Sequence, residues 1–465
     1  MNKIKMFITL ILAVSILGSS AALAESFGVG NFEYVPRYTQ GQFRDVDHSH
    51  WFSEYVRSAY NFGLLRGTGA DSFEPNRLLT LGEAVVLAAR MRSVFFTGHA
   101  DFPTARPFFL PYVDYALEYN IIDSGEMDFF APATRAQLAD MIFRSLPSHV
   151  FAQINHVSCF AIADVSPHDD FAQSIYALYR AGILRGSDRF GTFFPSSTIT
   201  RAESSALLVR TVNPDSRVNI TLPTEIPAEV IFSRVTDAVF MIETFDENGR
   251  SIRTASGFFL TSTGMALTNF HVFDFAESAT VTLTNGNVYN IDGFYSVCMR
   301  SNLAVFSIDA EYDNFSTLTL GDSDLVETGN LIYALGSPMQ LMNSLSSGVV
   351  SSRNREVNGR YYIQFSAPIS FGSGGSALLN SLGQVIGITY LSFTGGQNLN
   401  LAVPINRFRD MVMLDSPVSF ELARNVFDTN ADTDDDIDAD EEADEEYDDD
   451  FDDLYEQPDG DEYED

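Results

Sequence analysis

Two stretches of the chain carry side chains that could perform acid–base and nucleophilic chemistry. His271 follows the apolar run Met265–Leu267, and an imidazole with a near-neutral pKa can take a proton from a hydroxyl and return it to a leaving group. Further on, residues 372–376 read Gly-Ser-Gly-Gly-Ser, and a tight glycine turn can expose a nucleophile and direct backbone amides at a developing oxyanion. A lone histidine is commonly structural and a Gly/Ser run is commonly a flexible turn. Whether these residues are catalytic therefore depends on the elements around them.

These stretches lie among many short β-rich segments. Turn pairs such as Asn248-Gly249 and Asn285-Gly286 separate them, which favours an all-β barrel or sandwich over residues 229–413. The expected strands are 239–244, 256–260, 266–269, 279–283, 303–308, 331–335, 362–365, 384–389 and 399–403.

Three segments in order, 255–272, 301–306 and 367–388, resemble the trypsin-like serine proteases, closest to the bacterial HtrA/DegP-like branch. The resemblance implies a double β-barrel in which His271 is the general base and Ser373 the nucleophile. It implies an oxyanion hole made by the backbone of Phe371, Gly372 and Ser373. About 20 residues separate Asn406 from the acidic tail, too few for the PDZ domain that often follows such proteases.

The chain departs from the family pattern at two positions. Asn302 stands where the family has aspartate, and an amide cannot stabilise an imidazolium, although Asp292 or Asp309 is a possible substitute in space. The glycine expected two residues before the nucleophile is Phe371. Ser376 is therefore a second candidate nucleophile, and a gapless match to the flanking residues places Gly374 there instead.

Three repeats precede this region, at residues 42–97, 98–150 and 160–213. The first and third share an Asp-Val opening, a Gly-x-x-x-Gly turn, a Phe-x-Pro or Phe-Pro step, and a Thr-x-x-Glu capping box before an apolar helix. The second is more worn and has Phe130-Ala131-Pro132 before Thr134. Each unit reads as a helix, an extended connector and a second helix, which cannot bury its apolar faces alone.

The repeats resemble the S-layer homology family, which implies an all-α, three-lobed helical domain that binds secondary cell-wall polysaccharide. The family's Thr-Arg-Ala-Glu arginine, which helps to hold the anionic sugar, carries over to Arg135 and Arg201, whereas Leu81 replaces it in the first repeat. Taken alone, the two arginines would be surface residues at helix starts. Residues 214–228, with three prolines, form a linker.

Residues 1–24 read as a cleaved secretory signal, with Lys3 and Lys5, an apolar run and a small-x-small cleavage site. A membrane anchor is the alternative, but the apolar run is short and no later stretch could cross a bilayer. We expect a secreted protein of the cell wall, associated with the S-layer.

Composition argues against two further classes of function, nucleic-acid binding and metal binding. The net charge is −35, and residues 428–465 hold 23 acidic and no basic residues, which predicts a disordered acidic tail and argues against nucleic-acid binding. Cys159 and Cys298 form no metal-binding spacing, so no metal is implied. No cofactor is implied either, because the expected chemistry uses only side chains and backbone.

The sequence therefore predicts a wall-anchored, trypsin-like serine endopeptidase acting on polypeptides. The alternative is a catalytically impaired pseudoprotease that serves as a surface binding or adhesion protein.

Overall fold

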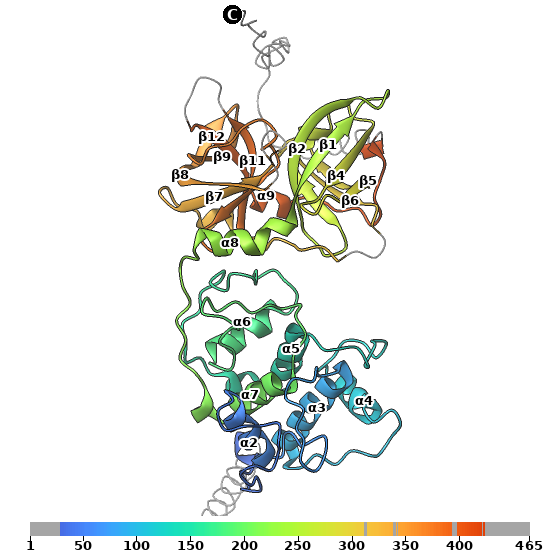
Figure 1. The fold of residues 1–465 in the computed structure, drawn as a ribbon, viewed down its shortest axis with the longest axis vertical. Coiled ribbons are helices and arrows are strands. Elements are labelled where there is room, and N and C mark those ends of the chain that lie inside the picture. The colour runs from blue at the N-terminus through green and yellow to red at the C-terminus, as the bar shows by residue number, and fades with distance from the viewer. Residues whose placement is uncertain are drawn as a thin grey trace, which may run out of the picture. The chain divides into compact units, whose positions relative to one another are not determined.

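The computed structural model describes residues 28–310, 314–337, 341, 343–392, 398–420 and 422–423. The chain forms two compact units that meet in sequence between Pro223 and Thr224 (Figure 1). The signal segment and the acidic tail predicted from sequence lie outside the described residues. Among those residues, no helix combines the length and the apolar character needed to cross a bilayer. The individual domain limits given above stay predictions.

Helices joined by extended connectors make up the first unit. Its α-helices are α2 (Ser53–Asn61), α3 (Leu81–Thr97), α4 (Leu110–Glu118), α5 (Arg135–Ser145), α6 (Ala172–Arg180) and α7 (Arg201–Val212), with short 3₁₀ turns at Val29–Asn31, Ser148–Phe151 and Pro214–Ser216.

The second helix of each repeat begins at a threonine. The N-caps of α3, α5 and α7 are Thr80, Thr134 and Thr200, and each hydroxyl accepts the backbone N–H three residues on while that residue's side chain accepts the threonine N–H. The two capping boxes predicted with glutamate are thus confirmed, and the glutamine of the second repeat makes a third. Since each box satisfies two first-turn amides, it fixes where the helix starts.

Three extended connectors meet in a ring at the centre of this unit. The Leu79 N–H donates to the carbonyl of Ile199 (2.9 Å), the Ile199 N–H to Ala133 (3.1 Å) and the Ala133 N–H to Leu79 (2.8 Å). Isolated antiparallel β-bridges flank this ring. The expectation of an all-α domain is not confirmed, because the repeats are joined through this small β element.

The ring also fixes the register of the second repeat. The N–H groups of Ala202 and Ala136 donate to Pro75 and Pro195, whereas the equivalent N–H of Gly82 donates to Phe129. Phe129 therefore stands where the other repeats have proline, and the Phe130-Ala131-Pro132 step read from sequence is displaced from that position.

The aspartate of each Asp-Val opening organises a connector. The Asp45 carboxylate accepts the backbone N–H groups of Phe73 (2.9 Å) and Glu74 (2.6 Å), and Asp164 makes the same pair of bonds in the third repeat. Glu74 has a positive φ of 56°, which an L-residue adopts only when its surroundings hold it there. The carboxylate supplies that support.

The second unit opens with α8 (Ala228–Val235) and continues as strands. These are β1 (Val239–Phe245), β2 (Ser251–Phe259), β3 (Met265–Thr268), β4 (Ser278–Thr282), β5 (Val288–Cys298), β6 (Leu303–Ile308), β7 (Leu331–Gly336), β8 (Ser344–Val357), β9 (Arg360–Phe365), β10 (Ala377–Asn380), β11 (Val385–Ser392) and β12 (Asn400–Pro404), followed by α9 (Asn406–Arg409).

The strands close into two barrels, in the orders β1-β2-β3-β6-β5-β4 and β10-β11-β12-β9-β8-β7 (Figure 1). All pairings between these strands are antiparallel. Buried aromatic rings such as Phe240, Phe259 and Phe306 fill the first barrel, and aliphatic side chains with Phe365 fill the second. The predicted double β-barrel is confirmed.

Candidate functional site

His271 lies in a short 3₁₀ turn (Phe270–Phe273) after β3, and Asn302 lies in the turn between β5 and β6. The Asn302 side chain makes two bonds to the histidine: Oδ1 accepts the His271 backbone N–H (2.9 Å), and Nδ2 lies 2.8 Å from the ring Nδ1. Asn302 has a positive φ of 53°, a conformation that asparagine and aspartate tolerate better than most residues. The structure therefore brings together two of the three predicted catalytic residues.

The orientation of the Asn302 amide decides which ring nitrogen carries hydrogen. A backbone N–H can only donate, so the atom that it meets must be the amide oxygen, and the NH₂ must then face the ring. Because that NH₂ donates to Nδ1, Nδ1 holds a lone pair and the hydrogen of neutral His271 sits on Nε2. A general base needs the opposite tautomer, with Nε2 free to accept.

The surroundings also disfavour the charged imidazolium. Burial, with a smaller contribution from the Arg253 guanidinium, lowers the pKa of His271 from 6.5 to about 4, and the Asn302 hydrogen bond offsets this only in part. At 1.36 kcal/mol per pKa unit, protonating the ring costs about 3 kcal/mol more than in water. His271 is thus neutral at pH 7 and a poor proton acceptor.

The predicted nucleophile is held by hydrogen bonds within its own turn. Ser373 is 3% exposed, its Oγ accepts the Ser370 N–H (3.2 Å), and its own N–H donates to the Ser370 carbonyl (2.9 Å). Ser376 is buried as well, and its Oγ lies beside Gly336. Within the described residues, neither hydroxyl has a hydrogen bond to His271.

Gly374 is the residue that faces the imidazole. A Cβ built on it would lie 3.9 Å from His271 Nε2, 3.9 Å from Asn269 Oδ1 and 4.0 Å from the Tyr390 carbonyl. Gly374 is absent from the residues with positive φ, so its backbone accepts an L side chain. The geometry agrees with the gapless alignment, in which Gly374 occupies the nucleophile position; Ser373 as nucleophile stays a prediction that the geometry does not favour.

The predicted oxyanion hole is only partly available. Of Phe371, Gly372 and Ser373, the last uses its N–H inside the turn. In the part of the chain that the structure describes, the N–H groups of Gly372 and Gly374 have no acceptor. These are the nucleophile position and the position two residues before it, the same pair that forms the oxyanion hole of chymotrypsin-type proteases.

Residues on the first barrel that sequence reasoning missed hold this loop. The Ser256 N–H donates to the Gly374 carbonyl (2.8 Å), and the Ser256 hydroxyl donates to the Gly372 carbonyl (2.8 Å). A Cβ on Gly375 would lie 2.1 Å from Thr268 Oγ1, so only glycine fits at that position. Both residues lie in the segment 255–272 that carries the family resemblance, but their contacts could not be predicted locally because their partners are more than a hundred residues away in the chain.

The possible substitutes for the missing carboxylate do not reach the ring. Asp292 and Asp309 are exposed, and among the described residues neither pairs with His271. Asn302 occupies Nδ1, so the imidazole has no carboxylate partner there.

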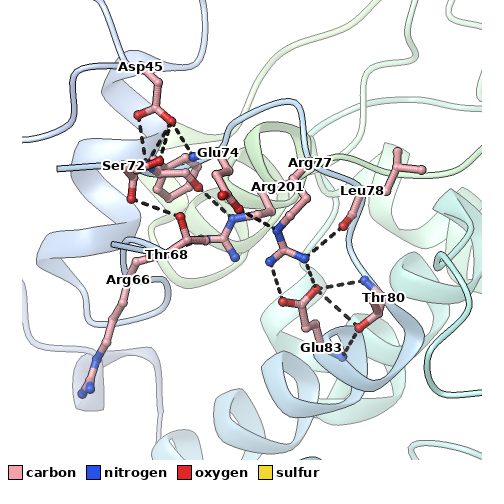
Figure 2. A network of polar contacts seen from close by, with 11 residues as sticks. Asp45, Arg66, Thr68, Ser72, Glu74, Arg77, Leu78, Thr80, Glu83 and Arg201 are labelled. Carbon is pink, nitrogen blue, oxygen red and sulfur yellow. Dashed lines mark hydrogen bonds and ion pairs between the residues drawn. The ribbon is translucent and has the colours of Figure 1, made fainter. Parts of the chain in front are cut away.

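The two predicted sugar-binding arginines lie between repeats and are almost fully buried. Arg201 is 6% exposed, and its guanidinium lies over the Phe73 ring. It donates through Nε to the Phe73 carbonyl (3.0 Å) and through Nη2 to the Arg66 carbonyl (2.8 Å). Figure 2 shows this site beside the Arg77–Glu83 ion pair (2.6 Å). Arg201 therefore also ties the third repeat to the first.

Arg135 repeats the arrangement between the second and third repeats. Its Nε donates to the Phe193 carbonyl (2.7 Å), and Nη1 pairs with Glu203 (3.3 Å). Leu81, at the matching position of the first repeat, is 5% exposed and offers no donor to a ligand.

Comparisons with known proteins define the class of both units. A trypsin-like peptidase domain model matches residues 255–388, and an S-layer homology domain model matches residues 42–85 and 161–203. The chain therefore contains S-layer homology domains, which indicate attachment to a cell surface, and a trypsin-like peptidase domain. Both assignments agree with the sequence prediction.

Individual relatives are HtrA/DegP serine proteases. A probable periplasmic serine endoprotease DegP-like of Halomonas elongata is 35% identical over 171 residues, covering 36% of this chain and 35% of that protein. The serine endoprotease DegS of Haemophilus influenzae is 34% identical over 167 residues, covering 34% of this chain and 48% of that protein. A solved HtrA-type protease with tripeptide matches 40% of this chain and 62% of its own, at 27% identity and a TM-score of 0.37. The chain spans less than half the length of these two curated relatives.

Proposed function

We propose that the S-layer homology unit holds this protein at the cell surface, where the peptidase-type cleft binds polypeptide with strongly impaired hydrolysis. The observation that carries the proposal is that Gly374, which has no hydroxyl, faces His271 Nε2. The orientation of the Asn302 amide supports it, because the imidazole then presents a hydrogen where a base needs a lone pair.

The cleft keeps the parts of a peptidase that bind substrate. The barrels, the histidine and two free backbone donors remain, and such a site without a triad member still holds a peptide carbonyl. We therefore expect the cleft to bind polypeptide and to hydrolyse it only slowly.

A second candidate is an active endopeptidase that uses Ser373. The serine endoproteases among the relatives favour it. It requires the Ser373 hydroxyl to leave its bond with the Ser370 N–H and turn toward His271.

Labelling with a fluorophosphonate probe separates the two candidates. We expect no labelling of the wild-type chain and no casein turnover above that of the Ser373→Ala and His271→Ala variants. Labelling at Ser373, lost in Ser373→Ala, would establish the second candidate and remove the first.

For the surface unit, we propose secondary cell-wall polysaccharide as the ligand of a secreted protein, with Arg135 and Arg201 at two of the grooves between repeats. Each guanidinium has one terminal nitrogen without a partner among the described residues, Nη2 in Arg135 and Nη1 in Arg201. That nitrogen is free to donate a charge-assisted hydrogen bond to an anionic sugar.

A pull-down on purified cell wall tests the anchoring. Arg135→Ala with Arg201→Ala should abolish binding, and Arg57→Ala serves as the control because Arg57 pairs with Glu54 on the surface of α2. Circular dichroism must show that the double variant stays folded; full wall binding by a folded double variant would remove the arginines from the proposal.

A further inference from the structure

Three N–H donors without hydrogen-bond partners among the described residues belong to the glycine-rich loop at residues 372–374 and to the histidine that faces it. Two are the backbone N–H groups of Gly372 and Gly374. The third is Nε2–H of His271, which lies 3.9 Å from the Cβ position of Gly374. Since Gly374 has no side chain, the space that a serine would fill is open.

The third donor exists because residue 302 is asparagine. With an aspartate, the histidine hydrogen would sit on Nδ1 and Nε2 would be an acceptor, which repels an anion. The Asn302 NH₂ reverses this, since it donates to Nδ1 and leaves the hydrogen on Nε2. Of the three atoms nearest to the open space, His271 Nε2 is then a donor, whereas Asn269 Oδ1 and the Tyr390 carbonyl oxygen are acceptors.

Two neighbours complete the pocket. The Arg253 guanidinium donates to the His271 carbonyl and brings positive charge to this side of the ring. Asn269 Oδ1, fully buried and without a partner, lies 3.9 Å from the Gly374 Cβ position. Its identity as the oxygen is fixed, because Nδ2 of the same amide donates to the Asn302 carbonyl.

We propose that this pocket captures the terminal carboxylate of a polypeptide, an inference that rests on the proposed polypeptide-binding function. The carboxylate lies in the space beside Gly374 and accepts from the Gly372 and Gly374 N–H groups and from His271 Nε2–H. The N–H of the ligand's last residue donates to Asn269 Oδ1. The site thus reads the end of a chain, whereas an endopeptidase binds its substrate across an internal bond.

Fluorescence anisotropy on the full chain at pH 8 tests the inference with two rhodamine-labelled random hexapeptide pools, one ending in a carboxylate and the other in a carboxamide. Each charge-assisted hydrogen bond contributes enough for about a ten- to a hundredfold effect, so the acid pool should bind at least tenfold tighter. Asn302→Asp, which turns Nε2 into an acceptor, and Gly374→Ser, which fills the space, should each remove most of that preference. Arg360→Ala, at the exposed first residue of β9, is the control and should keep it.

The two peptide pools distinguish carboxylate capture from polypeptide binding in general. Equal binding of both pools overturns carboxylate capture and leaves polypeptide binding in place. Binding of neither pool overturns both. Nitrogen-15 NMR of the ring gives an independent test: a hydrogen on Nε2 supports the inference, and a hydrogen on Nδ1 overturns it even where the pools differ.

Discussion

Gly374→Ser combined with Asn302→Asp should convert the cleft into a working peptidase. A Cβ at position 374 meets its nearest atoms only at 3.9–4.0 Å, which is ordinary contact, so serine fits without displacement. Its hydroxyl, one bond further out, comes within reach of a hydrogen bond to His271 Nε2 at about 2.6–3.2 Å. An aspartate at position 302 still accepts the His271 backbone N–H and also accepts a hydrogen bond from Nδ1–H, which frees Nε2 as the base.

The expected gain in rate follows from the two departures from the family pattern, at positions 302 and 374. In a chymotrypsin-type protease, changing the triad aspartate to asparagine lowers kcat about 10⁴-fold, so the reverse change should contribute about as much once a nucleophile is present. A carboxylate at position 302 would also raise the pKa of His271, which burial lowers to about 4. Gly374→Ser alone should therefore be weak, and the double variant about 10⁴-fold faster.

The assay is the rate of fluorophosphonate labelling together with hydrolysis of casein. Adding His271→Ala to the double variant should abolish both signals, which shows that the new activity uses the imidazole. A double variant that folds with the wild-type Tm, carries its histidine hydrogen on Nδ1 and still fails to label would refute the placement of residue 374 opposite the ring.

Three further outcomes are expected. Gly375→Ser should unfold or greatly destabilise the second unit, seen as a fall in Tm, because φ is 81° there and the new Cβ meets Thr268 Oγ1 at 2.1 Å; an unchanged Tm would contradict the loop geometry. The unfolding free energy should fall by up to about 3 kcal/mol as pH drops from 6.5 to 4, since the unfolded chain takes up the proton that folded His271 refuses, and His271→Gln should remove this part of the urea-measured pH dependence. Asp45→Ala should cost the first unit about 2 kcal/mol in urea unfolding, because it removes hydrogen bonds to a carboxylate. Burial raises the pKa of Asp45, but the Phe73, Glu74 and Ser72 bonds outweigh it and leave the pKa lowered, so this contribution is present above pH 4 and is lost as pH falls through the folded pKa; an Asp45 effect that is the same at pH 7 and pH 2 would contradict it.

Features that depend on local sequence could be read in advance. The threonine caps at Thr80 and Thr200 follow from residues three apart, and Gly63 and Gly182 end their helices with φ of 70° and 72°, as a left-handed C-cap requires. The strand pattern and its turns predicted an all-β barrel or sandwich, and the family resemblance narrowed this to the double barrel. The pairing of His271 with Asn302 followed from the family resemblance.

The register of the glycine-rich loop could not be read in the same way. Ser373 and Gly374 are neighbours, and glycine and serine both tolerate the turn, so local preference does not choose which one faces the imidazole. Bonds from Ser256, on a strand more than a hundred residues earlier, make that choice. The one sequence signal for it was the gapless match of the residues on either side of the loop.

The predicted register of the second repeat was wrong for a related reason. Phe129 takes the place of a proline because the Gly82 N–H, in another repeat, selects its carbonyl. A register set by contacts between repeats is invisible to a motif read within one of them.

The hydrogen-bonded ring of Leu79, Ala133 and Ile199 has a consequence for how the first unit gains its stability. In an open stack of repeats a terminal repeat can fray while its neighbours stay folded, but a closed cycle has no terminal member. Losing any one repeat breaks two of the three bonds and leaves one donor and one acceptor unsatisfied. Proteolytic cleavage in a connector outside the ring leaves every bond intact, so such a unit should survive nicking far better than truncation.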